Sequence, residues 1–315
     1  MKKIRSLSAQ LNYCVSDCFC CGVSKRADRK NGVPLGSRVY SVQTAENLRA
    51  TADNLANFIK EKHPEIKLVK EIKTEHIQEW IDEREKKWSD KTLKEQISRV
   101  GKLSEICSKT YGITLNWKIE TPERAKGHNI KKIREIAMDK ADLLLLKDDL
   151  SQKGRSENAL RAVEIASRCG LRSKEIARLR TDCIDIENKC LHIVEGAKNG
   201  KKRDVPIRKK DLPYFEDLKN TCMYFNNSEY VTDGVSEDSL NKAIRRSLQR
   251  LGLDDKYKNT SIHSIRKSYA TERYNEELKR NKGDERKSWE KVQEELGHGN
   301  RFRKELFNTY IQHTP

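Results

Sequence analysis

Apolar residues recur at helical spacing along most of this chain, and this periodicity limits the folds available to it. Leu48, Ala52 and Leu55 fall on one helical face, and Pro64 marks the end of that helix. The same spacing predicts two further helices, one carrying Ile77, Trp80 and Ile81, and one after Ser89 carrying Leu93, Ile97, Val100, Leu103 and Ile106. Residues 44–120 are therefore predicted to form a small all-α domain.

Residues 136–315 combine helices with a short β region. Alternation and β-branching predict strands within 184–186, 190–194 and 203–207, with a turn between the last two. Helices are predicted at 137–152, 156–169, 173–180, 236–251, 262–281, 284–296 and 302–312. The expected fold is mainly α with a small β-sheet: a helical domain followed by an α+β domain.

Two basic segments flank the helical domain. Residues 1–43 show no sustained periodicity and are expected to form an extended basic arm that ends in a turn. Residues 121–135 are broken by Pro122 and Gly127 and carry five basic residues. We expect this second segment to be a linker that itself contacts a polyanion, through Lys126, Lys131 and Lys132. The predicted organisation is thus 1–43, 44–120, 121–135 and 136–315.

The charge balance points to a polyanionic partner. The chain carries 65 Lys and Arg residues against 48 Asp and Glu residues, a formal charge of +17 over 315 residues. Composition alone leaves DNA, RNA and a membrane surface open. The longest apolar run, 143–146, has four residues, whereas a spanning helix needs about 20, so no transmembrane segment is expected. The basic N-terminus lacks the apolar run of a signal peptide, and we do not expect secretion.

Nine cysteines in a chain this long do not indicate a disulfide scaffold. Five stand singly among apolar residues, as buried reduced thiols do: Cys107, Cys169, Cys183, Cys190 and Cys222. The other four lie within eight residues: Cys14, Cys18, Cys20 and Cys21. They could hold zinc, but zinc sites use two separated pairs of ligands, and no His lies close by. The favoured interpretation is a reduced Cys-rich segment, and no metal or cofactor is expected.

Several cations of 136–315 stand in settings that suggest more than surface charge. Gly170 follows an apolar helix as a C-cap does, which places Arg172 at a joint between helices. His263 and Arg266, at i and i+3 on a predicted helix, can reach a single phosphate. The turn between the last two strands carries four basic residues for which phosphate steering is the simplest role: Lys198, Lys201, Lys202 and Arg203.

Two further residues complete an ordered set. His298 ends a helix between glycines, and Tyr310 lies beside polar residues close to the C-terminus. Taken singly, His298 would be interpreted as a structural histidine and Tyr310 as a tyrosine that packs in the core. Together with the cations, they follow the order Arg, Lys, His-x-x-Arg, Leu-Gly-His, Tyr over about 140 residues.

This ordered set resembles the catalytic domain of the tyrosine recombinase, or phage integrase, family. The resemblance covers 136–315, and 44–120 more loosely resembles the helical, SAM-like core-binding domain of those enzymes. It implies a site-specific DNA recombinase that cuts and rejoins strands through a 3′-phosphotyrosyl intermediate, in the service of a mobile genetic element. The implied partners are double-stranded DNA, three further copies of the chain on two paired sites, and accessory DNA-bending proteins, with no membrane.

The resemblance also implies a role for each residue. Arg172 and Arg266 would clamp the non-bridging phosphate oxygens, on which charge develops during the reaction. Tyr310 would be the nucleophile and His263 would take its proton, since a phenol is mostly neutral at pH 7. Three supporting roles are implied as well: Lys198 as the acid for the leaving 5′-oxygen, His298 as a phosphate contact, and Glu175 as a residue that orients the helix joint.

Three features depart from the family pattern. His298 and Tyr310 are 12 residues apart, wider than the usual spacing of the family, which predicts a longer loop at 299–304. Only 311–315 follow Tyr310, so assembly contacts are expected from elsewhere, for example from 302–312. Lys201 and Lys202 are also candidates for the acid that protonates the leaving oxygen. We choose Lys198 by counting back along the sequence from Val205-Pro206.

Other functions stay open at this point. A DNA-relaxing topoisomerase of type IB uses a similar tyrosine and similar cations, and a chromosome-dimer-resolving recombinase is a second biological role for the same chemistry. A non-catalytic DNA-binding regulator would bind without a covalent adduct. The sequence holds no Gly-x-x-x-x-Gly-Lys-Ser/Thr phosphate loop and no carboxylate cluster of the two-metal kind. We expect a cytoplasmic protein that associates with the nucleoid. Its gene is expected to be prokaryotic or encoded by a phage.

Overall fold

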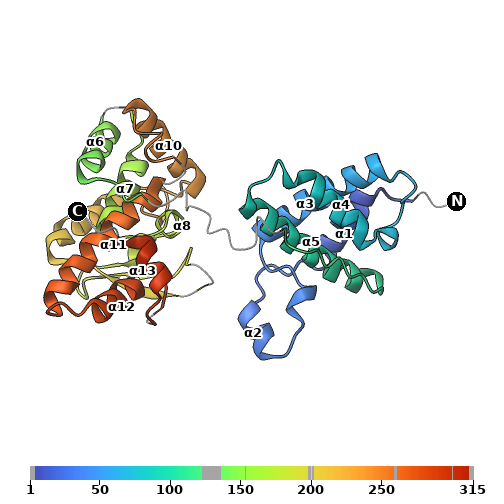
Figure 1. Cartoon of the computed structure of the whole chain (residues 1–315). Helices are drawn as coiled ribbons and strands as arrows, with labels where there is room; N and C mark the ends of the chain where they lie inside the picture. The colour runs from blue at the N-terminus through green and yellow to red at the C-terminus, as the bar shows by residue number, and fades with distance from the viewer. Residues whose placement is uncertain are drawn as a thin grey trace. The chain divides into compact units, whose positions relative to one another are not determined.

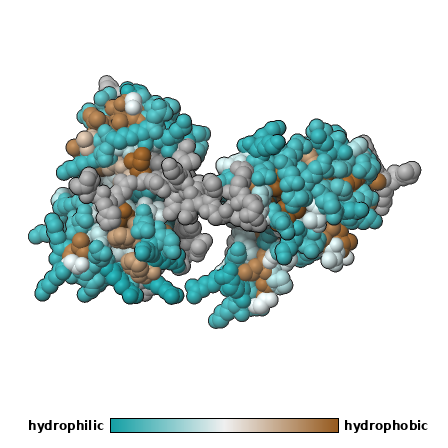
Figure 2. Space-filling model, in the orientation of Figure 1, coloured by the Kyte–Doolittle hydropathy of each residue, from teal (hydrophilic) through white to brown (hydrophobic). Residues whose placement is uncertain are grey.

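The computed structural model describes residues 4–122, 136–152, 154–197, 200, 202–258, 261–299 and 301–311. They belong to two compact units, Met1–Lys131 and Lys132–Pro315 (Figure 1). Most of the surface visible in Figure 2 is hydrophilic, as expected of a chain in which 36% of residues are charged. Among the described residues, no helix has both the length and the apolar character needed to cross a membrane.

Among the described residues of the first unit, every regular element longer than an isolated bridge is a helix. Its elements are α1 (Leu7–Asp17), α2 (Lys25–Lys30), the 3₁₀ turn η1 (Leu35–Ser37), α3 (Val42–Lys62), η2 (Val69–Glu71), α4 (Thr74–Glu85) and α5 (Asp90–Tyr111). The helices α3, α4 and α5 confirm the three predicted from periodicity. Side chains of Ser41 and Ser89 cap the N-termini of α3 and α5, which fixes where these helices begin.

The expectation of an extended arm at 1–43 is wrong. Helix α1 begins after the Ser6 cap, and Leu7, Leu11, Cys14 and Val15 pack into the same core as α3 and α5. Their spacing is that of one helix face, so the hydrophobic effect drives this segment onto the unit. Helix α2 is short and carries most of the basic run 25–30.

The four clustered cysteines differ in their burial and in their hydrogen bonds. Cys14 and Cys18 are buried, and their thiols donate to the carbonyl oxygens of Gln10 and Ile106. Cys20 donates to the carbonyl of Val39, while Cys21 is exposed. Among the described residues, none of these four cysteines belongs to a group of three or more potential metal ligands that lie close enough together to bind one ion. The structure therefore gives no support to a zinc site at 14–21.

The second unit is α+β. Its helices are α6 (Lys140–Ser151), α7 (Glu157–Cys169), α8 (Ser173–Ala177), α9 (Leu212–Phe225), α10 (Glu237–Arg250), α11 (Ser261–Arg280), α12 (Glu285–Glu295) and α13 (Lys304–Tyr310), with 3₁₀ turns η4 (Thr181–Cys183) and η6 (Lys209–Asp211). Seven of the eight helices match predicted ones. Helix α9 was not predicted, although Pro213 in its first turn and the spacing of Phe215, Leu218 and Cys222 are signals of a helix.

The sheet has three short antiparallel strands in the order β1 (Ile184–Asp185), β2 (Cys190–Ile193) and β3 (Arg203–Pro206). Asp185 pairs with Cys190, and His192 pairs with Asp204. Leu191, Ile193 and Val205 point into the core, so the residues between them face outward. Cys107, Cys169 and Cys222 are buried as expected, but Cys183 and Cys190 are only partly buried.

Helix α11 lies between two hydrophobic clusters and positions the functional residues. Ile262 and Ile265 belong to the large cluster shared by α6, α7, α10 and the sheet. Tyr269 and Ala270 belong to a smaller cluster with α12 and α13, which also contains Tyr310. The apolar contacts on both sides hold the turn of α11 that carries His263 and Arg266 at the junction of the two clusters.

Candidate active site

Arg172 is held at the joint between α7 and α8. Gly170 ends α7 in the left-handed region, with φ at 61°, and a Cβ there would overlap the ring of Tyr269. Arg172 is the N-cap of α8, and its backbone N–H donates to Oε2 of Glu175 at 2.9 Å. Its guanidinium donates to Oε1 of the same carboxylate at 2.8 Å. Glu175 therefore orients the joint, as the sequence suggested.

Glu175 also binds a second arginine. Arg203 donates through two nitrogens to the Glu175 carboxylate, at 2.8 and 3.0 Å, and through Nε to the carbonyl of Glu295 at 2.8 Å. Burial alone would raise the pKa of Glu175, but the hydrogen bonds and charge of Arg203 and the charge of Arg266 lower it to about 2. The carboxylate is thus ionised at neutral pH and ties α8, β3 and the end of α12 together.

Arg266 is fully buried, with an exposed side-chain fraction of 0%. Its guanidinium donates to the carbonyl oxygens of Gly170 and Leu296, and its Nε lies 3.3 Å from the Tyr310 hydroxyl. Burial lowers the pKa of Arg266, and the nearby charge of Arg172 acts in the same direction. Two guanidinium groups so close together favour an anion between them.

The Tyr310 hydroxyl lies among these cations at the end of α13. It is 3.1 Å from Nε2 of His298, and the same Nε2 lies 3.3 Å from Arg172 and 3.5 Å from Arg266. The hydroxyl oxygen accepts from Nε of Arg266. Nε2 of His298 has one lone pair for its three neighbours, so the direction of its hydrogen bond with the hydroxyl follows from its tautomer. The phenol is thereby held between a guanidinium and an imidazole.

The backbone around His298 is fixed by three contacts. Gly297 has φ at 72°, and a Cβ there would lie 2.9 Å from Cζ of Arg203. The buried Gln293 amide donates to the carbonyls of Gly299 and Arg301, at 2.8 and 2.6 Å. Within the described residues this loop runs from the end of α12 to the start of α13 at Lys304, which agrees with the longer loop expected at 299–304.

His263 is half-buried on α11 beside the same tyrosine. Its ring lies edge-on to that of Tyr310, with centroids 5.8 Å apart and an interplanar angle of 68°. The His298 ring has a similar relation to Tyr310, at 5.4 Å and 63°. Two imidazoles therefore flank one phenol.

Five of the predicted basic residues lie outside the described part of the chain: Lys126, Lys131, Lys132, Lys198 and Lys201. Lys202 is described and exposed. Arg203 was expected on or near the turn, at the start of the predicted strand 203–207, and its role as a phosphate contact stays a prediction. It opens β3 with only 11% of its side chain exposed, because Glu175 and the Glu295 carbonyl occupy its guanidinium.

Sequence reasoning also missed the supports of the site. Arg273 donates from α11 to both oxygens of Glu295, at 3.0 and 3.1 Å, which fixes the end of α12 just before His298. The i and i+7 spacing of Arg266 and Arg273 on one helix was the available signal. The Arg203–Glu175 pair joins residues 28 positions apart in the chain and leaves no local pattern.

Taken together, the site offers a phenol, two adjacent guanidinium groups and two imidazoles. Planar guanidinium groups match the geometry and charge of phosphate oxygens. A tyrosine held against such a pair is suited to attack a phosphodiester, because the charge that develops is stabilised by donors already in place.

Comparisons with known proteins agree with this chemistry. The model of the "Phage integrase family" matches residues 125–314. No curated protein sequence matches the chain. The chain is similar in structure to a lambda integrase tetramer bound to a Holliday junction, with 14% identity, a TM-score of 0.61, and coverage of 96% of this chain and 79% of that one.

Two other solved structures are similar to the same extent. One is the Tn1549 transposon integrase in complex with circular intermediate DNA, with 14% identity, a TM-score of 0.58, and coverage of 99% of this chain and 97% of that one. The other is the XerH site-specific recombinase bound to a palindromic substrate, with 16% identity, a TM-score of 0.59, and coverage of 95% and 91%. At such identities the likeness concerns the fold.

Proposed function

Because this chain belongs to the phage integrase family, we propose that it is a site-specific DNA recombinase that cuts and rejoins strands through Tyr310. The observation that carries the proposal is the position of the Tyr310 hydroxyl, within hydrogen-bond distance of both Arg266 and His298. Arg172 contacts the same histidine, so all four groups meet around one point where a phosphate would bind.

In the proposed cleavage step, the Tyr310 oxygen attacks the phosphorus of a phosphodiester. A phosphotyrosyl bond forms at the 3′ side, and the bond to the 5′-oxygen breaks. Arg172 and Arg266 bind the non-bridging oxygens, whose charge grows toward the transition state. The covalent bond retains the energy of the broken phosphodiester, so the 5′-hydroxyl of another strand can reverse the step without ATP.

Two residues carry the proton transfers, and a third aligns the hydroxyl. His263 accepts the phenolic proton, as the family resemblance implies, and Lys198 donates a proton to the leaving 5′-oxygen. His298 aligns the hydroxyl before attack and then contacts the phosphate. The position of the His263 ring beside that of Tyr310, with centroids 5.8 Å apart, supports its role.

The proposed partners are double-stranded DNA and further copies of the chain. The net charge of +17 supports binding to a polyanion. Residues 44–120 would act as the core-binding domain, and 121–135 as a linker that contacts the backbone with Lys126, Lys131 and Lys132. Since a similar integrase was solved as a tetramer on a Holliday junction, we propose four protomers on two paired sites, with accessory DNA-bending proteins.

A mobile genetic element is the proposed setting, in the cytoplasm and on the nucleoid of a prokaryotic host. The fold shared with a transposon integrase supports this role. The fold shared with a Xer recombinase keeps chromosome-dimer resolution as the second candidate. The arrangement of the DNA sites decides between them.

Covalent trapping tests the proposal. Wild-type protein and the Tyr310→Phe variant are incubated with fragmented host DNA and denatured in detergent, and the ends of protein-linked DNA are sequenced. We expect adducts from the wild type alone, with one recurrent end sequence. Adducts without a preferred sequence would indicate a topoisomerase. Binding to this DNA without any adduct from either protein would indicate a non-catalytic regulator.

A further inference from the structure

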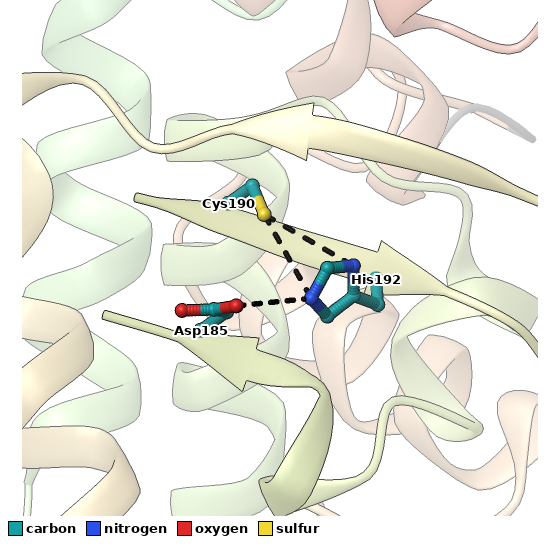
Figure 3. Close-up of side chains that lie close together, drawn as sticks. All are labelled: Asp185, Cys190 and His192. Carbon is teal, nitrogen blue, oxygen red and sulfur yellow. Dashed lines mark hydrogen bonds and ion pairs between the residues drawn. The ribbon is translucent and has the colours of Figure 1, made fainter. Parts of the chain in front are cut away.

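The outer face of the small sheet gathers a thiol, an imidazole and a carboxylate that the recombinase site does not use. Asp185 lies on β1, and Cys190 and His192 lie two residues apart on β2, so all three point to the same side (Figure 3). One ligand atom from each lies within 4.8 Å of the others, and this is the one such group among the described residues.

Two of the distances between ligand atoms are close to those of tetrahedral coordination. Nε2 of His192 lies 3.3 Å from Oδ2 of Asp185 and 3.9 Å from Sγ of Cys190. Around zinc, with bonds of about 2.0 Å to nitrogen and oxygen and about 2.3 Å to sulfur, ligand atoms lie roughly 3.3–3.8 Å apart. Sγ of Cys190 also lies 4.0 Å from Nδ1 of His192, so a rotation of the Cys190 side chain toward Nε2 would bring the three atoms onto one ion.

Two neighbours hold the ligands in place. Nδ1 of His192 lies 2.8 Å from Oδ1 of Asp204, the residue paired with it on β3. A ligating imidazole typically donates its second N–H to a carboxylate in this way, which fixes the tautomer that leaves Nε2 free for the metal. The amide and backbone N–H of Asn188 both donate to the Asp185 carboxylate at 2.8 Å.

We propose that Asp185, Cys190 and His192 form a binding site for a zinc-like divalent cation, with Asp204 as the carboxylate that orients His192. The sulfur ligand selects such an ion over Mg²⁺ and Ca²⁺, which take oxygen ligands. With His192 38% and Asp185 23% exposed, the fourth coordination position opens to solvent and takes a water molecule.

The ion would crosslink all three strands. These strands are only two to four residues long, and so short a sheet gains little stability from its own pairing. The ion joins β1 to β2 directly and β3 through Asp204. Since β2 and β3 flank the segment of the sequence that contains Lys198, the site would stiffen the two strands from which that segment extends. This inference does not depend on the recombinase activity.

Cobalt substitution of the full-length protein tests the site. We expect the reduced wild-type protein to bind one Co²⁺, with a thiolate-to-cobalt charge-transfer band in the near ultraviolet, and Zn²⁺ to abolish that band by displacement. Cys190→Ser should abolish the band. His192→Gln should weaken Co²⁺ binding strongly, and Asp204→Asn should keep the band but weaken binding about 10–100-fold.

Matched controls come from the other accessible thiols. Cys183→Ser removes a cysteine of similar burial in the same unit, and Cys21→Ser removes the exposed N-terminal one. Both should keep the wild-type band. The proposal is overturned if the wild type shows no charge-transfer band at saturating Co²⁺, or if the band survives in Cys190→Ser. His192→Gln keeps every thiol, so wild-type Co²⁺ affinity in this variant overturns the site independently, and circular dichroism verifies that both variants are folded.

Discussion

The hydroxyl of Tyr310 lies 3.1 Å from Nε2 of His298, a residue 12 positions earlier in the chain. The contact joins the end of α12 to the end of α13, and Arg266 of α11 reaches the same hydroxyl at 3.3 Å. The hydroxyl is therefore held by the fold of the protein itself. Its orientation depends on three separate helices, and each can be tested through a side chain.

The two histidines should respond differently to truncation. We expect His263→Ala to slow formation of the covalent adduct by about 10²–10⁴-fold, the usual contribution of a proton acceptor. His298→Ala removes one hydrogen bond that aligns the hydroxyl, and we expect about a tenfold loss. Single-turnover cleavage of a suicide substrate measures both. A greater loss for His298→Ala would assign the proton transfer to His298.

Arg172 is the better arginine for testing the phosphate clamp. Arg266 also holds the carbonyls of Gly170 and Leu296, so its removal would disturb folding as well as catalysis. Arg172 is partly exposed, and Glu175 keeps Arg203 when Arg172 is lost. We expect Arg172→Ala to lower the cleavage rate about 10²–10³-fold. This is the usual effect of removing a hydrogen-bond donor that stabilises the negative charge of the transition state. Thermal unfolding of the variant should change little; a cleavage rate near that of the wild type would remove Arg172 from the clamp.

Stability should fall in acid because of Glu175. Its pKa is lowered from an ordinary 4.5 to about 2 in the folded protein, so the folded state favours the ionised carboxylate. The stabilisation is fully present above about pH 4.5 and is lost as the pH falls toward 2. At 1.36 kcal/mol per pKa unit the difference is about 3 kcal/mol. Urea unfolding between pH 7 and pH 3 captures about 2 kcal/mol of this difference, because Glu175 is still mostly ionised in the folded protein at pH 3, and Glu175→Gln should show a shallower dependence. An equal slope in both proteins would mean that other carboxylates carry the effect.

Most of the fold could be predicted because amphipathic periodicity is a local property. Every helix of the second unit except α9 was found in this way, and so were all three strands. Helix α1 was missed because no sustained periodicity was recognised in 1–43, where Cys14 and Cys18 were counted as part of a Cys-rich segment. Cys14 and Cys18 instead continue the apolar face begun by Leu7 and Leu11.

The reactive residues of the site could be predicted, but their supports could not. Arg172, Arg266 and Tyr310 occur in the same order as the catalytic residues of the family that the sequence resembles, and this order identified them as candidates. Arg203 looked like one more basic residue of a turn, because nothing near it in the chain shows that it pairs with Glu175. Such a contact depends on how β3 packs against α8, which only the folded chain determines.

The two glycines beside His298 make a matched pair for the last prediction. Both have positive φ, 72° at Gly297 and 86° at Gly299, so a side chain at either position adds backbone strain of about 1–3 kcal/mol. Only at Gly297 would the new Cβ also press on Arg203, at 2.9 Å from its Cζ, whereas nothing lies within 4 Å at Gly299. We expect Gly297→Ala to be less stable than Gly299→Ala by about 1–3 kcal/mol, the usual cost of overpacking.

The same two glycine variants distinguish an effect on the active site from an effect on stability. Arg203 is held by Glu175 and the Glu295 carbonyl, so it can yield to a Cβ at Gly297 only by loosening those contacts. That shift would move the segment carrying His298, and we expect Gly297→Ala to lose more cleavage activity than its unfolding curve explains. Cleavage measured well below the unfolding temperature of each variant provides the comparison. Equal activity in the two variants would show that the Arg203–Glu175 pair supports stability without positioning His298.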